Sequence, residues 1–229
     1  MGKIYTALGL MSGTSMDGVD ASIIKSDGDR EYSIKMDEYF EYGGELRQKL
    51  INIREKVLVV DDLKTHSDEI KSLEKEITLF HANAVNKILK TSKIEIDLIG
   101  FHGQTIFHDP SINITKQLGD GNMLSQLTKK LVVYDFRQND LKNGGQGAPL
   151  APIYHYLLVK TFKEKGTIKI PTIILNIGGI ANITSINESY KMISMDVGPG
   201  NCLIDKWIMS NSNKSFDNNG DIAKSGKVD

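Results

Sequence analysis

Apolar residues alternate with polar ones, or cluster as β-branched runs, in short segments at the start of the chain. Turn residues separate these segments, so the pattern predicts strands joined as hairpins: Lys3–Leu10, Val19–Lys25 and Tyr32–Phe40. Apolar residues then recur at spacings of three and four, which predicts helices over Gly44–Arg54 and Leu63–Leu89. The chain is therefore expected to begin with a small sheet followed by helices.

The same order of strands and helix returns later in the chain. Between the two sets the pattern predicts strands at Ile94–Phe101 and Leu131–Tyr134, and helices at Asn122–Lys130 and Pro149–Lys165. The second set has strands at Thr172–Ile177, Ala181–Ile186 and Tyr190–Val197, then a helix from about Asn201. We therefore expect an α/β protein with one domain over residues 1–165 and the first part of a similar, incomplete domain over residues 166–229.

Composition narrows the class of protein. The 229 residues are 40% hydrophobic and 25% charged, which is sufficient for a buried core of ordinary size. The formal net charge is -1, so no overall field favours nucleic acid or an anionic membrane. Cys202 is the single cysteine, and no apolar run is long enough to span a membrane. These properties predict a cytoplasmic protein with neither nucleic acid nor membrane as a partner.

The segment LGLMSGTSMDGVDASII, Leu8–Ile24, carries the first candidate chemistry. Its tight turn offers backbone N–H groups and hydroxyls that can hold an anion, and Gly13 and Gly18 allow close approach of the backbone. Val19 and the aspartate after it stand where a Walker A loop has Lys and Ser or Thr, so this is not a P-loop. Asp17 is a candidate magnesium ligand. A glycine-rich hairpin with solvated aspartates is the alternative.

A second glycine turn lies at the corresponding place in the second set of strands. It is NIGGIANIT, Asn176–Thr184. Two such turns that face each other would form a two-sided phosphate clamp. The pairing of the turns favours a nucleotide-binding protein.

Ordered motifs along the chain carry a resemblance to a known family. They are LGLMSGTSMDGVDASI, IGFHGQTIFHDP, QLGDGN, DFRQNDLKNGGQGAPLAPIYH, LNIGGIANIT and DVGPGNCLIDKWI. Together they resemble the anhydro-N-acetylmuramic acid kinases of the sugar kinase, Hsp70 and actin superfamily. The resemblance implies two ribonuclease-H-like domains and an ATP- and Mg²⁺-dependent kinase of peptidoglycan recycling. Such an enzyme hydrolyses the 1,6-anhydro ring of its sugar and phosphorylates O6, giving N-acetylmuramic acid 6-phosphate and ADP.

The resemblance also assigns residues to roles. Asp196 corresponds to the catalytic aspartate, which would accept the proton of the attacking water. The nucleotide would contact the following residues, among which Asp17 would also hold the metal: Ser12, Gly13, Thr14, Ser15, Met16, Asp17, Gly18, Val19, Gly178, Gly179 and Asn182. The sugar would contact His102, Gln104, Asp120, Arg137, Gly198 and Asn201. Arg137 is expected in a loop, where it could pair with the lactyl carboxylate of the sugar.

Each of these roles has a structural alternative. His102 could be a hydrogen-bonded histidine at a strand end, and Asp120 a residue that begins a helix. Arg137 could form a surface salt bridge, and Asp196 could cap a helix or lie in a turn. His81 and His155 fall in helical stretches and are expected to be packing or surface residues.

Length limits what the resemblance implies. Members of the family are longer, and the adenosine-binding glycine motif that should follow is not among these residues. The sequence therefore predicts a fragment with little kinase activity alone. A noncatalytic nucleotide-binding scaffold of the Hsp70 or actin type and a glycoside hydrolase stay as alternatives, and a homodimer is left open.

Overall fold

The structure is a computed structural model that describes residues 2–227. Contacts between Cα atoms divide the chain between Leu150 and Ala151 into two compact units. The boundary expected from the sequence lies after residue 165, and helix α6 (Pro152–Glu164) accounts for the difference. This helix contacts strands β8 (Ile180–Ile186) and β9 (Met192–Pro199), so it belongs to the second unit.

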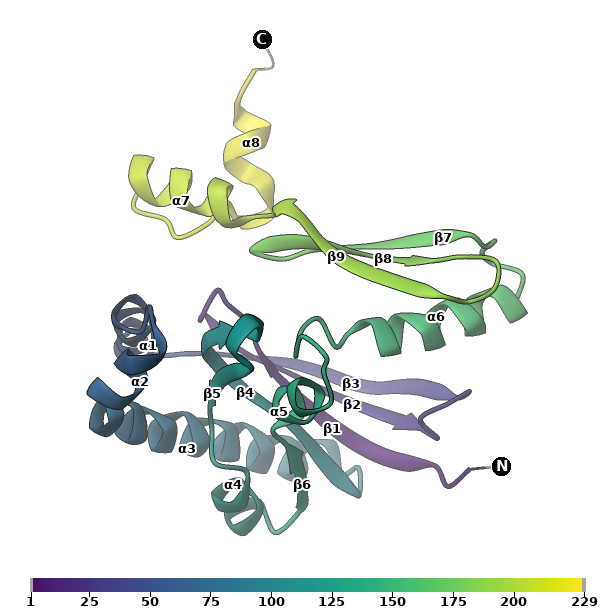
Figure 1. Cartoon of the computed structure of the whole chain (residues 1–229), viewed down its shortest axis with the longest axis horizontal. Coiled ribbons are helices and arrows are strands. Elements are labelled where there is room, and N and C mark those ends of the chain that lie inside the picture. Colours follow the sequence, from purple (N-terminus) through teal and green to yellow (C-terminus); the bar gives the residue numbers. More distant parts are fainter. Residues whose placement is uncertain (1, 228–229) are drawn as a thin grey trace. The chain divides into compact units, whose positions relative to one another are not determined.

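The first unit is built on a mixed sheet (Figure 1). Its strands are β1 (Tyr5–Ser12), β2 (Gly18–Ser26), β3 (Tyr32–Glu41), β4 (Leu98–Asp109), β5 (Ile114–Leu118) and β6 (Leu131–Tyr134). The strand order is β3-β2-β1-β4-β5, with β6 also paired to β4. Strands β1 to β3 are antiparallel, whereas β4 is parallel to both β1 and β6. Three antiparallel strands that continue into parallel ones form the ribonuclease-H-like arrangement expected from the sequence.

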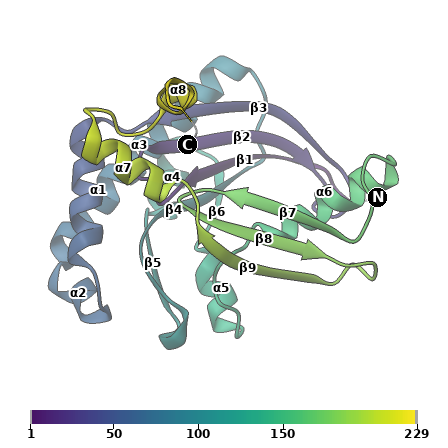
Figure 2. The same ribbon diagram turned by 90° about the horizontal axis from the view of Figure 1, so that it is seen from above.

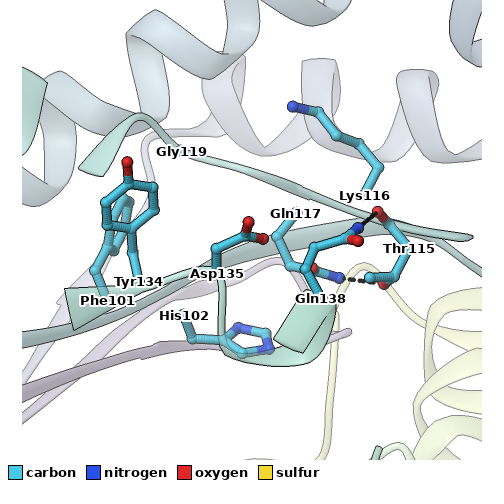
Figure 3. A pocket seen from close by; sticks show the side chains of 9 residues that line it. All are labelled: Phe101, His102, Thr115, Lys116, Gln117, Gly119, Tyr134, Asp135 and Gln138. Carbon is cyan, nitrogen blue, oxygen red and sulfur yellow. Dashed lines mark hydrogen bonds between the residues drawn. The ribbon is translucent and has the colours of Figure 1, made fainter. Parts of the chain in front are cut away.

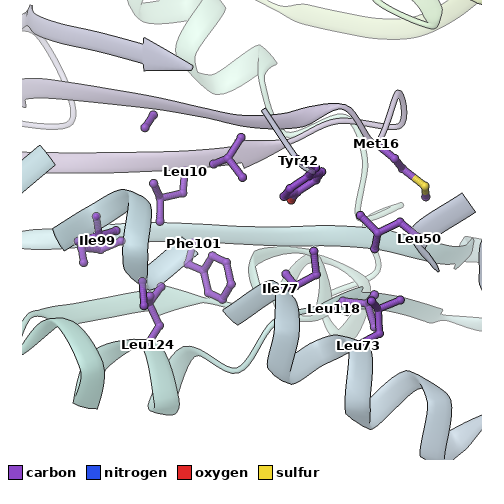
Figure 4. Packing of buried hydrophobic residues seen from close by; sticks show 14 of the residues in the cluster. Leu10, Met16, Tyr42, Leu50, Leu73, Ile77, Ile99, Phe101, Leu118 and Leu124 are labelled. Atoms are coloured by element: carbon purple, nitrogen blue, oxygen red, sulfur yellow. The ribbon is translucent and has the colours of Figure 1, made fainter. Parts of the chain in front are cut away.

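Helices of the first unit cover the sheet and close its core. They are α1 (Gly44–Lys56), α2 (Val60–Thr65), α3 (Ser67–Ser92), α4 (Gly121–Thr128) and α5 (Phe136–Lys142). The spacing of three and four that predicts α3 also gives its buried side, where Leu73 and Ile77 lie in the core (Figure 4). Leu10 and Phe101 enter the same core from β1 and β4. Full burial of each such side chain contributes roughly 1.5–3 kcal/mol.

The second unit repeats the beginning of the first. Strand β7 (Thr172–Ile177) pairs with β8 and β8 pairs with β9, both antiparallel. Helix α7 (Cys202–Asn211) follows β9 (Figure 2), and α8 (Asp221–Ser225) comes after a short 3₁₀ turn. The predicted return of three strands and a helix is confirmed. Among the residues that the structure describes, no helix is long and apolar enough to cross a membrane.

Some elements differ from those expected. Strand β4 does not end at Phe101 but runs on to Asp109, because the residues from Gln104 onward pair with β5; Gly103, with a positive φ of 73°, lies where the register with β1 shifts. His102 and Gln104 therefore lie inside a strand, and the prediction that they end one is wrong. Strand β5 is not predicted by the sequence pattern, since three of its five residues are polar. The segment after β6, expected as a loop, forms helix α5.

Candidate functional site

The turn between β1 and β2 is held in place by a backbone hydrogen bond and by a buried side chain. Met16 adopts a left-handed conformation with φ 53°, and its N–H donates to the carbonyl oxygen of Gly13 at 3.2 Å. The Met16 side chain is fully buried in the core (Figure 4). Thr14 and Ser15 are exposed at the tip. Met16 thus fixes the turn and leaves its tip accessible to a ligand.

Ser12 does not face the tip of this turn. The residue is 1% exposed, and its hydroxyl lies 2.6 Å from Gln104 Oε1, 2.7 Å from Tyr42 Oη and 3.1 Å from the carbonyl oxygen of Gly18. Val19 is also fully buried, in strand β2. The expected contact of the Ser12, Met16 and Val19 side chains with a nucleotide is therefore corrected: these side chains belong to the core.

The predicted contact of Gln104 with the sugar is also corrected. Its side chain is 0% exposed, and both ends of the amide are occupied by the protein. Oε1 accepts from Ser12, while Nε2 donates to the carbonyl oxygen of Gly13 at 2.9 Å. An amide engaged in this way offers nothing to a sugar. Tyr42, which the sequence analysis did not single out, completes the same cluster.

Two acidic side chains lie beside the turn. Asp17 is partly buried, and its Oδ1 accepts a hydrogen bond from Ser15 Oγ at 2.6 Å. Burial, and then the charge of Asp17, raise the pKa of Asp20. No cluster of three or more His, Cys, Asp or Glu side chains that could hold a metal occurs in residues 2–227. The turn could therefore hold a hard cation only through one or two carboxylates together with ligand oxygens, which is how Mg²⁺ commonly binds beside phosphates.

A polar pocket of about 320 Å³ opens on strands β4 and β5 of the first unit (Figure 3). Its lining consists of Phe101, His102, Thr115, Lys116, Gln117, Gly119, Tyr134, Asp135 and Gln138. Aromatic rings and hydrogen-bonding groups both contribute to this lining. A pocket of this size and character suits a small polar ligand such as a monosaccharide.

His102 in this pocket is joined to Arg137 on helix α5. Arg137 Nε donates to His102 Nε2 at 2.9 Å, and His102 Nδ1 lies 2.7 Å from the carbonyl oxygen of Gly103. Nδ1 therefore carries the proton and Nε2 accepts. Burial, and then the guanidinium charge, lower the pKa of His102 to about 4, so the ring is neutral near pH 7. Of the predicted sugar residues, His102 and Arg137 are the pair that the structure brings together.

Arg137 is partly buried without a carboxylate beside it. No ion pair to Arg137 is found within residues 2–227, so the salt-bridge alternative is not what the structure contains. Burial lowers its pKa, although a guanidinium stays charged. A partly desolvated guanidinium that lacks a protein anion is a suitable partner for a ligand carboxylate or phosphate.

Two aspartates near the pocket differ in role. Asp120 is the N-cap of α4, where its carboxylate accepts from the N–H groups of Asn122 at 2.9 Å and Met123 at 3.0 Å. This is the helix-start alternative, and it accounts for Asp120 without a ligand. Asp135, the first residue of the DFRQND motif but not a predicted site residue, lines the pocket in a left-handed conformation with φ 62° and occupies the N-cap position of α5 without a side-chain hydrogen bond to the helix. Such strain at a pocket is a signal that only the structure reveals.

The predicted residues of the second unit gather at one end of its sheet. The N–H of Asn201 donates to the carbonyl oxygen of Gly178 at 2.8 Å, and the N–H of Gly200 donates to that of Gly179 at 3.0 Å. A side chain on Gly200 would collide with the carbonyl oxygen of Gly178, so only glycine fits there. The glycine turn after β7 and the turn after β9 therefore form one hydrogen-bonded unit. Asn201 takes part in this unit through its backbone N–H group. The expected contact of its side chain with the sugar stays a prediction.

Asp196 lies on β9 directly opposite Asn182 of β8. It is exposed and is not the residue before α7, since Asn201 occupies the N-cap position. The helix-cap alternative for Asp196 is therefore wrong. Its carboxylate is exposed on β9, and its role as the catalytic base stays a prediction.

The strand order of the first unit and its partial repetition in the second define a protein of the ribonuclease-H-like class, in which the same fold occurs twice. The family model for anhydro-N-acetylmuramic acid kinase matches residues 5–229, and the chain belongs to this family.

Curated relatives agree with this assignment. The chain is 54% identical over 232 residues to the anhydro-N-acetylmuramic acid kinase of Pelagibacter ubique, across all of this chain and 60% of the relative. It is 41% identical over 234 residues to the enzyme of the same name from Agrobacterium fabrum, across 61% of that protein. The chain thus spans about three fifths of the length of these relatives. Among solved structures, the Ppx/GppA phosphatase of Aquifex aeolicus is similar with a TM-score of 0.41 and 11% identity, over 89% of this chain and 55% of that one, too little to support an argument.

Proposed function

We propose that this chain is the part of an anhydro-N-acetylmuramic acid kinase that holds the phosphates, the sugar and the catalytic base. In the reaction, water attacks C1 of 1,6-anhydro-N-acetylmuramic acid and the bond between C1 and O6 breaks. O6 then attacks the γ-phosphorus of ATP, and ADP leaves. The product is N-acetylmuramic acid 6-phosphate, formed in the cytoplasm during peptidoglycan recycling.

The pairing of Asp196 with Asn182 is the observation that carries this proposal. Asn182 lies three residues after Gly179, so the carboxylate and the glycine turn share one end of the sheet. A general base beside a phosphate site is what a combined hydrolysis and phosphoryl transfer requires, because water and γ-phosphate react at neighbouring atoms of the sugar. Asp196 accepts the proton of the water as it attacks.

The residues present fit a nucleotide with a magnesium ion. The exposed tip of the first turn offers the N–H groups of Thr14 and Ser15 and the Thr14 hydroxyl to phosphate oxygens, and Gly178 and Gly179 offer a second glycine turn. Asp17 would hold Mg²⁺ beside the phosphates, where the ion neutralises their charge.

The pocket of the first unit is the proposed sugar site. Arg137 pairs with the lactyl carboxylate of the sugar, since its guanidinium has no protein carboxylate partner among residues 2–227. His102, neutral and fixed in one tautomer, has both ring nitrogens bound to the protein, so it acts on the sugar by orienting Arg137.

Isotope labelling tests the reaction directly. A chimera that continues this chain with the carboxyl-terminal part of the Pelagibacter relative is incubated with the anhydro sugar and ATP in H₂¹⁸O. We expect ¹⁸O at O1 and phosphate at O6 in the same product, formed only with ATP. Ring opening without ATP would indicate a glycoside hydrolase, and ATP binding without any product would indicate a noncatalytic scaffold.

A further inference from the structure

The carbonyl oxygens of the turn between β1 and β2 are held by donors of the protein. Gln104 Nε2 donates to the oxygen of Gly13 at 2.9 Å, and Arg54 Nη1 donates to that of Thr14 at 2.9 Å. The N–H of Tyr42 donates to the oxygen of Asp17 at 2.8 Å. These carbonyl groups, whose oxygens would repel an anion, are therefore hydrogen-bonded to donors from β4, from α1 and from the residue that follows β3.

A hydrogen bond that holds a carbonyl oxygen toward the protein also sets the direction of the N–H group of the next residue. In a planar trans peptide, the C=O of one residue and the N–H of the next point in opposite directions. The cis peptide bonds of the described residues lie elsewhere, before Pro149 and Pro171. Because the oxygen of Gly13 points inward to buried Gln104, the N–H of Thr14 points outward. By the same reasoning, the N–H of Ser15 points away from Arg54.

The orientation of the Gln104 amide is itself fixed. The single proton of the Ser12 hydroxyl can reach Gln104 Oε1 at 2.6 Å or the carbonyl oxygen of Gly18 at 3.1 Å, and the shorter contact favours Gln104. In that arrangement Tyr42 is the donor in the 2.7 Å contact between Tyr42 Oη and Ser12 Oγ. Burial raises the pKa of Tyr42, so its hydroxyl keeps the proton that it donates. A flipped amide would place oxygen against the Gly13 carbonyl. With Oε1 facing Ser12, Nε2 donates to the carbonyl oxygen of Gly13 at 2.9 Å and more weakly to that of Thr105 at 3.4 Å, so its shorter bond is to the turn.

We propose that Gln104 is a positioning residue for the polyphosphate of the nucleotide. By holding the Gly13 carbonyl inward before any ligand is present, it presents the Thr14 N–H to a phosphate oxygen. The inference rests on the proposed nucleotide binding at this turn. Gln104 touches the turn rather than the ligand, so it acts through the backbone.

The second unit has the same arrangement with other donors. The carbonyl oxygens of Gly178 and Gly179 accept from the N–H groups of Asn201 and Gly200, so the N–H of Gly179 also points away from the protein donors. Backbone groups perform there what the Gln104 side chain performs in the first unit. In both glycine turns, carbonyl oxygens are hydrogen-bonded to protein donors. This shared feature is an independent reason to regard these carbonyl groups as part of an anion site.

Binding of inorganic tripolyphosphate to this chain tests the proposal. Affinity is measured by calorimetry, and the amide resonances of Thr14 and Ser15 are followed by NMR. Gln104→Met keeps the volume of the side chain but removes the donor, and we expect about 5- to 20-fold weaker binding, on the order of one hydrogen bond to a charged system. Thr128→Val is the control, because it removes a buried hydrogen bond of the first unit, from Thr128 Oγ1 to the carbonyl oxygen of Leu124, and leaves Gln104 and the turn unaltered. Its affinity should stay within twofold of the unaltered chain.

The outcomes separate the two proposals. If the unaltered chain binds tripolyphosphate with shifts at Thr14, but Gln104→Met binds equally well, the positioning role is overturned and the phosphate turn stands. If the unaltered chain shows no binding at the turn, the proposed nucleotide site fails and the positioning role fails with it. Should Gln104→Met not fold, ¹⁵N relaxation of the unaltered, ligand-free chain decides: order parameters near 0.85 at Gly13–Asp17 support the proposal, and values below about 0.6 contradict it.

Discussion

Arg137 donates a hydrogen bond to His102 Nε2 at 2.9 Å, and this contact sets the state of both side chains. Burial, and then the charge of the guanidinium, keep the histidine neutral, while the hydrogen bond to the ring occupies one donor of the guanidinium. Helix α5 supplies the arginine and strand β4 the histidine, so two motifs separated by 35 residues act as one unit.

Replacement of Arg137 by Gln should weaken binding of 1,6-anhydro-N-acetylmuramic acid by about 10- to 100-fold, the usual range for a lost hydrogen bond between charged groups. Binding of 1,6-anhydro-N-acetylglucosamine, which lacks the lactyl carboxylate, should change by less than about threefold. Calorimetry with the two sugars makes the comparison. Equal losses for both would contradict the pairing of Arg137 with the carboxylate.

Buried histidines should make stability depend on pH. The pKa of His102 and of His81 is lowered to about 4 in the folded chain, chiefly by burial, against an ordinary value of 6.5. The unfolded chain therefore takes up protons first as the pH falls, so stability is constant above about pH 6.5 and is lost between pH 6.5 and 4. A shift of this size corresponds to at most roughly 3 kcal/mol for each group.

Urea unfolding between pH 4 and 8 measures this dependence, with His81→Leu as the informative variant. His81 is fully buried, and its Nε2 has no hydrogen-bond partner among the described residues. The variant should lose about half of the pH dependence. A stability profile that stays flat from pH 7 to pH 4.5 in the unaltered chain would contradict the assigned histidine states.

Much of this arrangement follows from the sequence, and some of it does not. Hydrophobic spacing predicts α3, and the repeated set of three strands with its glycine turns is confirmed in the second unit. The continuation of β4 past Phe101 could not be predicted, because a glycine between polar residues is typical of a turn, whereas pairing of Gln104–Asp109 with β5 keeps this segment in the sheet. Burial of Ser12 and Gln104 could not be predicted, since their hydrogen-bond partners come from β2 and β4 and from Tyr42.

Substitution of Gly103 by Ala should destabilise the first unit. The residue has φ 73°, and a Cβ there would overlap with the carbonyl oxygen of Leu118 on β5. Loss of roughly 1–3 kcal/mol is expected from urea unfolding. Gly44→Ala is the control, because a side chain at Gly44 meets open space at the start of α1. A variant at Gly103 as stable as the Gly44 control would show that the strand tolerates a side chain there.

The second unit exposes apolar side chains that should bind a hydrophobic dye. Leu175 is 54% exposed on β7 and Ile193 is 62% exposed on β9, whereas Leu8 and Leu10 on β1 of the first unit are buried. We therefore expect strong fluorescence of a dye that binds apolar surface. The double variant Leu175→Thr with Ile193→Thr should reduce this fluorescence by more than half. Unchanged fluorescence would show that the dye does not bind at Leu175 and Ile193.

The kinetics of Asp196→Asn test the central claim most directly. In the chimera completed with the Pelagibacter segment, the amide keeps the shape of the side chain but cannot accept the proton of water. We predict that kcat falls by roughly 10²- to 10⁴-fold, the usual contribution of a general base, while KM values and melting temperature change little. Asp221→Asn, an exposed position on α8, is the matched control and should retain kcat. An Asp196→Asn enzyme with unchanged kcat would contradict the assignment of Asp196 as the base.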